Sequence, residues 1–303
     1  MSRIKNLTLP LAMLLGVFCY RWFYRLAPVT PFLIFIMLFF TFCKVDIHAM
    51  RIRSWHWILL MFQLFVSVGC FFLLRPFDLL LAQGVMLCVL MPTATAAAVI
   101  TGKLGGNVEQ LTTYTLLSNF AVALFAPVFF PIVNPSAHLT FLQGFLTILM
   151  KVFPLLIGPF LAALLLRSMY RWICGKSLRP SPFFSDLPFY IWAFSLVILM
   201  ASTTHSLIYD DYDKLSAVLL AVGSLCTCLL QFGVGKWIGK KQGSTVSAGQ
   251  ALGQKNTILG IWMAHTYLLP LSALGPAAYI IWQNLFNSWQ LWRQGKKNDS
   301  SSL

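Results

Sequence analysis

Long apolar segments alternate with short polar or basic ones along nearly the whole chain. Because a membrane-spanning helix needs about 20 apolar residues, this pattern predicts ten transmembrane helices. The segments nearly exhaust the sequence, so we expect one transmembrane unit over residues 1–303 without a soluble domain. The ten helices are expected at Leu7–Arg25, Pro28–Lys44, Trp55–Leu74, Phe77–Thr101, Val108–Val133, Leu139–Leu166, Phe184–Ile208, Leu215–Lys236, Ser244–Leu268 and Leu271–Trp292.

Two of these segments contain stretches that a lipid-exposed helix would not tolerate. Pro92–Ala98 lies inside the fourth segment, and Gly249–Thr257, which reads Gly-Gln-Ala-Leu-Gly-Gln-Lys-Asn-Thr, lies inside the ninth. Unwound backbone at membrane depth survives only where protein or a water-filled cavity satisfies its free polar groups. Paired interruptions in corresponding positions of two halves are typical of a secondary transporter. The alternative is that both stretches are small-residue packing faces.

The segments fall into two groups of five, joined by a basic connection from Arg167 to Arg179. An odd number of helices in each half inverts the second half relative to the first. In each half, a helix with a glutamine, Gln63 or Gln231, precedes the interrupted helix. We therefore predict an all-α polytopic membrane protein with ten transmembrane helices in two inverted five-helix repeats. Its fourth and ninth helices are expected to be broken and to cross each other.

Composition and charge support a membrane protein. The chain is 58% hydrophobic and 10% charged, which excludes an ordinary soluble domain and a disordered chain. If the N-terminus is inside, sixteen of the 22 Lys and Arg residues fall on inner loops and tails and four on outer loops. This asymmetry follows the positive-inside rule, so the net charge of +14 orients the protein and indicates no nucleic-acid partner. We expect a multi-pass protein with both termini cytoplasmic.

The short loops indicate a bacterial inner membrane. The expected partners are the lipid bilayer and a small-molecule substrate, and the sequence indicates no protein partner. It also lacks the patterns of an enzyme, since it contains no GxSxG, no HExxH and no His/Asp/Glu cluster at ligand spacing. We therefore expect a protein that is not an enzyme and needs no cofactor.

Lys255 is the main functional candidate, because it places a cation near the middle of the ninth segment. Ionisable residues within transmembrane segments usually serve function, and snorkelling or a structural pairing is the alternative. The remaining candidates are polar residues of the two interruptions and of the helices expected beside them. They are Gln254, Asn256 and Thr257, Thr93 and Thr95, and Gln63.

Two further candidates have weaker support from the pattern. Thr112, Thr115 and Asn119 share one face of the fifth helix, which is equally typical of a cation path and of interhelical hydrogen bonding. Lys151 lies in the middle of the sixth segment. Two interpretations are equally open: it faces the cavity and meets an anionic substrate, or it has no contact with substrate.

The motifs at the interruptions resemble the bile acid:sodium symporter (BASS) family over essentially the whole length of the chain. The resemblance rests on Met91–Ala96, Gly105–Val108, Gly253-x-x-Asn256-Thr257 and the helix that carries Gln63. It implies a panel domain, about 7–44 and 139–208, and a core domain, about 55–133 and 215–292, with substrate between them. It also implies sodium-driven symport of a small organic anion, such as a bile acid.

The chain departs from the family where members bind sodium. By register, the family's shared glutamate falls on Ala251, a Ser-Asn ligand pair on Ala97 and Ala98, and a glutamine on Lys255. Of the family's ligands, Thr115 and Gln63 are retained, so no confident metal site is predicted. We expect that the Lys255 ammonium replaces a sodium ion and that H⁺ or no ion couples transport. The alternative is a conventional Na⁺-coupled symporter whose sites are rebuilt from carbonyls and Thr115.

Overall fold

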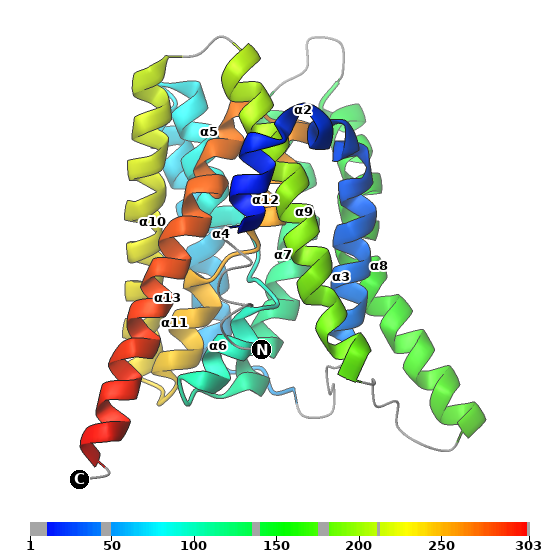
Figure 1. Ribbon diagram of the computed structural model, residues 1–303, viewed down its shortest axis with the longest axis vertical. Coiled ribbons are helices and arrows are strands. Elements are labelled where there is room, and N and C mark those ends of the chain that lie inside the picture. The colour runs from blue at the N-terminus through cyan, green and yellow to red at the C-terminus, as the bar shows by residue number, and fades with distance from the viewer. Residues whose placement is uncertain (1–10, 44–49, 135–139, 175–181, 211–212, 302–303) are drawn as a thin grey trace. The chain divides into compact units, whose positions relative to one another are not determined.

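The computed structural model describes residues 11–43, 50–134, 140–174, 182–210 and 213–301. These residues form α-helices and two short 3-10 helices, without any strand (Figure 1). Residues 11–18 are also helical. The helices are α2 (Tyr20–Phe23), η1 (Tyr24–Val29), α3 (Thr30–Phe42), α4 (Ser54–Leu74), α5 (Leu79–Leu90), α6 (Ala97–Lys103), α7 (Val108–Val133), α8 (Phe141–Cys174), α9 (Pro182–Tyr209), α10 (Lys214–Lys240), α11 (Thr245–Gly253), α12 (Thr257–Tyr267), η2 (Pro270–Ala273) and α13 (Leu274–Ser301).

Six helical segments within the described residues are long and apolar enough to cross a membrane. Their composition and length make the chain an all-helical membrane protein. The six segments are Tyr20–Phe42, Ser54–Leu74, Val108–Val133, Phe141–Ile173, Leu187–Tyr209 and Lys214–Lys240.

The predicted helix ends are accurate for α4 and α7 and differ elsewhere. The loop predicted between Arg25 and Pro28 is wrong, because the 3-10 helix Tyr24–Val29 connects α2 directly to α3. The predicted start at Leu7 lies outside the described residues. α8 continues to Cys174 and α13 to Ser301, beyond the predicted ends. The extension of α8 carries Arg167 and Arg171, and that of α13 carries Arg, Gln and Lys; these residues end an apolar pattern but favour helix.

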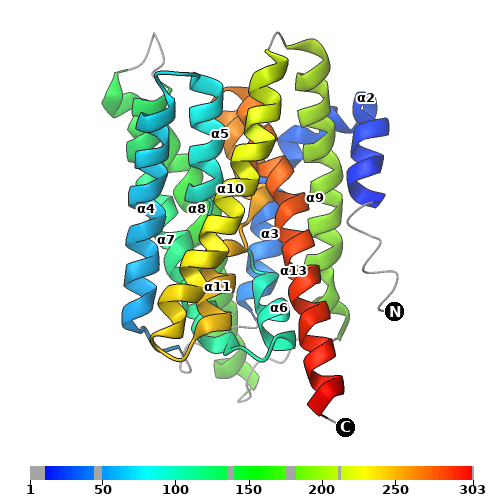
Figure 2. The ribbon, with the colours of Figure 1, turned by 90° about the vertical axis from the view of Figure 1, so that its left-hand side faces the viewer.

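The described residues pack as two units. The first comprises Met1–Asp46, Ala123–Tyr212 and Ile261–Ala273, and in it α3 packs on α8 and α9. The second comprises Ile47–Val122, Asp213–Gly260 and Leu274–Leu303. In this second unit α5 packs against α4 and α10, and α10 packs against α11 and α13 (Figure 2).

Glycines allow the backbones of α10 and α11 to approach closely. A Cβ atom on Gly235 would lie 2.5 Å from the carbonyl oxygen of Ala248 and 2.9 Å from the Cα atom of Gly249. A Cβ atom on Gly239 would lie 2.7 Å from the carbonyl oxygen of Ser244. Such distances leave no room for a side chain, so this helix pair depends on glycine at both positions.

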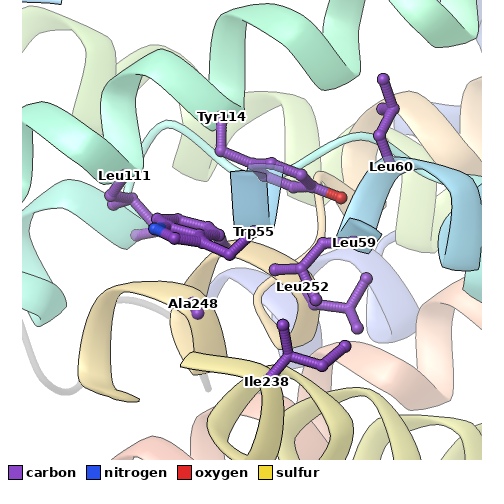
Figure 3. Packing of buried hydrophobic residues seen from close by; sticks show 10 residues of the cluster. Trp55, Leu59, Leu60, Leu111, Tyr114, Ile238, Ala248 and Leu252 are labelled. Carbon is purple, nitrogen blue, oxygen red and sulfur yellow. The ribbon is translucent and has the colours of Figure 1, made fainter. Parts of the chain in front are cut away.

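A buried cluster of the second unit fixes the position of the Tyr114 side chain. The rings of Trp55 and Tyr114 lie 6.1 Å apart between centroids and are nearly parallel. Leu59 and Leu252 pack in the same cluster, which joins α4, α7, α10 and α11 (Figure 3). Both rings are fully buried, so the direction of the Tyr114 hydroxyl group is set by packing.

The start of α5 is held to α10 by one carboxylate. Asp78 accepts a hydrogen bond from the backbone N–H of Leu81, 2.9 Å away, and another from the hydroxyl group of Ser216. Burial raises the pKa of Asp78, but these hydrogen bonds favour the ionised form and bring the pKa below its usual range. Asp78 is therefore a charged N-cap that also links two helices.

Candidate functional site

Both predicted interruptions are present, and both lie in the second unit. The chain leaves helix at Met91–Ala96, between α5 and α6, around Pro92, which has no N–H to donate to the helical hydrogen-bond pattern. It leaves helix again at residues 254–256, between α11 and α12. The unwound stretches are shorter than predicted, because residues 97–98 begin α6 and residues 249–253 complete α11.

The glycines of the second interruption serve packing rather than unwinding. A Cβ atom on Gly253 would lie 2.4 Å from the Phe232 ring, and one on Gly249 would lie 2.6 Å from Cγ of Lys236. Both neighbours belong to α10. The small-residue interpretation is therefore correct for residues 249–253 and wrong for the three polar residues that follow.

The two unwound stretches pair with each other through their backbones. The N–H of Ala94 donates to the carbonyl of Gln254 at 2.9 Å, and the N–H of Asn256 donates to the carbonyl of Pro92 at 2.8 Å. Between these bonds, Thr93 and Lys255 form an antiparallel bridge. Backbone groups that the broken helices leave free are thus satisfied within the protein, as a membrane interior requires.

Lys255 is buried at this junction, with 1% of its surface exposed. Its ammonium group donates a hydrogen bond to the carbonyl of Val89 in the last turn of α5, at 2.9 Å. A helix C-terminus carries partial negative charge, which favours a cation there. Among the described residues no carboxylate pairs with Lys255. The partner that the structure provides for the ammonium is therefore a carbonyl of a broken helix.

A glutamine and a tyrosine hold the C-terminus of α5. The Gln63 amide nitrogen donates to the carbonyl groups of Leu90 and Met91, at 2.7 and 3.1 Å. The Tyr114 hydroxyl group donates to the Gln63 amide oxygen at 2.9 Å. Both ends of the Gln63 amide are therefore engaged, and Gln63 caps a helix in this structure.

A second glutamine and tyrosine hold the C-terminus of α11. The Tyr279 hydroxyl group donates to the carbonyl of Gly253 at 2.8 Å and accepts from the Gln231 amide nitrogen at 3.1 Å. Gln231 also contacts the carbonyl of Cys88 at 3.2 Å. We call these two sets, Gln63 with Tyr114 and Gln231 with Tyr279, the Gln–Tyr pairs.

The polar residues of the two breaks have different roles. Thr93 is buried, and its hydroxyl group donates to the carbonyl of Ala251 at 2.6 Å, while Thr95 is half-buried. The side-chain oxygen of Asn256 accepts the N–H of Leu259 at 3.2 Å. Asn256 therefore caps α12, which begins at the buried Thr257.

Several buried polar side-chain atoms near the junction have no hydrogen-bond partner within the described residues. They include the oxygens of Asn119, Gln231 and Gln254 and the nitrogen of Asn256. Asn119 follows Ser118, whose hydroxyl group accepts the backbone N–H of Thr93 at 3.1 Å. Because buried polar groups are nearly always paired, these atoms are candidate contacts for an ion, a water or a ligand.

The remaining predicted site residues are less closely tied to the junction. Thr112 and Thr115 donate to carbonyl groups of their own helix, those of Val108 and Leu111. Lys151 lies on α8, in the first unit, with an exposed side chain.

Comparison of the chain with protein-family models and with curated proteins found no match. A function therefore has to be inferred from the residues of the chain itself.

Sequence reasoning missed Tyr114, Tyr279 and Gln283. The amide oxygen of Gln283 accepts the backbone N–H of Lys255 at 2.9 Å, so it helps to fix the unwound stretch. All three residues are buried inside apolar segments. A buried hydroxyl or amide group must find a partner, and that requirement is the signal that could have indicated them.

Replacing Tyr279 by phenylalanine is expected to destabilise the protein by about 1–3 kcal/mol, because the buried carbonyl of Gly253 loses its donor. Thermal unfolding in detergent measures the change. Tyr114→Phe should have a similar effect, whereas Tyr190→Phe, at an exposed position, should have none. An unchanged melting temperature for Tyr279→Phe would contradict a stabilising role for this Gln–Tyr pair.

Proposed function

We propose that the protein is a secondary transporter of a small organic anion, similar to bile acid:sodium symporters, in which Lys255 takes the place of a sodium ion. One observation carries this proposal. A buried ammonium lies where two broken helices pair, without a carboxylate partner among the described residues. A fixed cation of this kind attracts an anion, and an intramembrane ionisable residue is rarely without function.

Ten transmembrane helices in two inverted repeats are part of the same proposal. The Gln–Tyr pairs support it, because each takes its glutamine from the helix before an interrupted segment, α4 or α10, and its tyrosine from the helix after that segment, α7 or α13. The proposal includes a panel and a core domain, alternating access, both termini in the cytoplasm and a bacterial inner membrane. The basic residues of the inner loops support this orientation.

The cost of burying Lys255 suggests how transport is coupled. An ammonium held by one carbonyl has lost most of its hydration, at a cost of several kcal/mol. Either the arrival of a substrate carboxylate or the loss of the proton relieves this cost. We therefore infer that Lys255 binds the anion directly and couples its movement to a proton or to a second anion.

A sodium-coupled symporter is the second candidate, and one observation favours it. The side-chain oxygens of Asn119 and Gln254 are buried acceptors without a partner among the described residues. Sodium is a hard cation that takes oxygen ligands, and these two atoms, with Thr115 and backbone carbonyls, would offer a rebuilt site.

Thermal unfolding of the purified protein in sodium, potassium or choline separates the two candidates. A ligand at about ten times its Kd adds roughly 1.4 kcal/mol to stability. We expect the wild type to respond equally to all three cations and Lys255→Gln to gain a response to sodium alone. Lys103→Gln, at an exposed position of α6, serves as the control and should behave as the wild type.

Specific stabilisation of the wild type by sodium would contradict replacement of the ion by Lys255 and favour the symporter. The anion itself is tested by the same assay with a panel of small carboxylates and bile acids. At least one should stabilise the wild type and lose its effect in Lys255→Gln. If no anion stabilises the wild type, the proposed substrate class is wrong.

A further inference from the structure

The basic ends of α10 and α13 carry two cations over a continuous set of aromatic rings. The Lys236 ammonium lies 5.0 Å from the centre of the Phe286 ring, and the Arg293 guanidinium lies 5.6 Å from that of Trp289. The Phe286 and Trp289 rings are themselves 5.6 Å apart. The two positive charges repel each other. Neither has a carboxylate partner among the described residues, so their charges remain available to an anion.

This arrangement is held in place before any ligand binds. The Lys236 side chain packs on Gly249 of α11, where a Cβ atom would lie 2.6 Å from its Cγ atom. The Phe286 ring contacts Phe232 of α10 at 4.5 Å between centroids. A half-buried lysine with a fixed stem loses little entropy when it binds.

Exposed tryptophans and aliphatic residues lie on the same two helices as the cations. Trp237 and Trp289 are 61% and 45% exposed, and Lys241 lies over the Trp237 ring at 4.4 Å. Tryptophans of this kind are enriched where the bilayer meets water. Two exposed leucines continue the apolar surface away from the charges along the two helices. Leu230 shares a face of α10 with Trp237, and Leu285 shares a face of α13 with Trp289.

We propose that Lys236 and Arg293 bind the phosphate of an anionic phospholipid, whose acyl chains lie along the exposed apolar faces of α10 and α13. Charge complementarity selects an anionic headgroup over a zwitterionic one. The tryptophans and the aliphatic residues beyond them select a lipid over a soluble phosphate, because only a lipid covers both the charged and the apolar part of this surface. The site depends on the membrane location of the chain and not on transport.

Native mass spectrometry of the full chain in detergent tests the site by titration with phosphatidylglycerol, phosphatidylcholine and glycerol phosphate. The wild type should prefer phosphatidylglycerol. Lys236→Gln combined with Arg293→Gln should bind it about 30-fold more weakly, because each cation near a membrane surface contributes about 1 kcal/mol. Arg75→Gln combined with Lys214→Gln is the control, because it removes two charges from the same unit at the other end of α10. This control should bind as the wild type does.

Each of three results would overturn the site. The first is equal affinity of the wild type for phosphatidylcholine and phosphatidylglycerol. The second is a loss of affinity in the control variant as large as that in the test variant. The third is binding of glycerol phosphate as tight as that of the lipid, which would make this a site for a soluble phosphate. If the double variant fails to fold by circular dichroism, Arg293→Gln alone, at an exposed position, should weaken binding about fivefold.

Discussion

Lys255→Glu is expected to prevent accumulation of folded protein, whereas Lys255→Met should fold at least as well as the wild type. The glutamate would place a carboxylate against the carbonyl of Val89, at the negative end of α5. An unpaired buried charge costs about 3–5 kcal/mol, a large part of the 5–15 kcal/mol that stabilises a typical protein. Methionine leaves the Val89 carbonyl without a donor but removes the cost of burying the ammonium.

Size-exclusion chromatography of detergent extracts and thermal unfolding measure both variants. Lys103→Glu makes the same change at an exposed position of α6, in the same unit, and should leave the melting temperature unchanged. Wild-type stability of Lys255→Glu would mean that water or a counter-ion reaches this position. Marked destabilisation of Lys255→Met would mean that the ammonium has a structural role, and the case for a substrate-binding lysine would weaken.

Gly235→Leu is expected to destabilise the protein by about 3 kcal/mol or more, because its side chain would occupy the space of the α11 backbone. The first added atom already lies 2.5 Å from the Ala248 carbonyl oxygen. Backbone cannot move aside as a flexible side chain can, so overpacking here separates the two helices. The α11 helix, which leads into the second unwound stretch, would then lose its packing against α10.

Gly233→Leu provides a matched control on the same helix. A Cβ atom at this exposed position meets nothing within 4 Å, and leucine favours helix over glycine by roughly 0.5–1 kcal/mol. Thermal unfolding should therefore show a small gain for Gly233→Leu and a large loss for Gly235→Leu. Equal effects of the two variants would contradict close packing of α10 against α11.

The interruptions were predictable from the sequence because they have local causes. Pro92 lacks an N–H and therefore weakens a helix around it, and Gln254, Lys255 and Asn256 form a polar run that no lipid-facing helix carries. Their lengths were overestimated, since Ala97 and its neighbour are strong helix formers. The ends of α8 and α13 were misplaced for a related reason. Hydropathy locates the edge of an apolar segment, and a helix does not have to end there.

The pairing of Thr93 with Lys255 was not predictable in the same way. A local pattern specifies periodicity and breaks, but it does not specify which distant backbone satisfies a free N–H group. The Gln–Tyr pairs were hidden for the same reason, because Tyr114 and Tyr279 look like ordinary aromatic residues of apolar helices. The inverted repeat, the substrate class and the coupling ion stay predictions.

The pairing of the two broken segments also constrains how the chain is made. Lys255 follows its partner Val89 by 166 residues. At a synthesis rate of 5–20 residues per second, that separation amounts to roughly 10–30 s. For that time the nascent end of α5 has its Gln63 cap but neither Lys255 nor the backbone of residues 254–256. The first half of the chain therefore enters the membrane before the groups that pair with its break have been made.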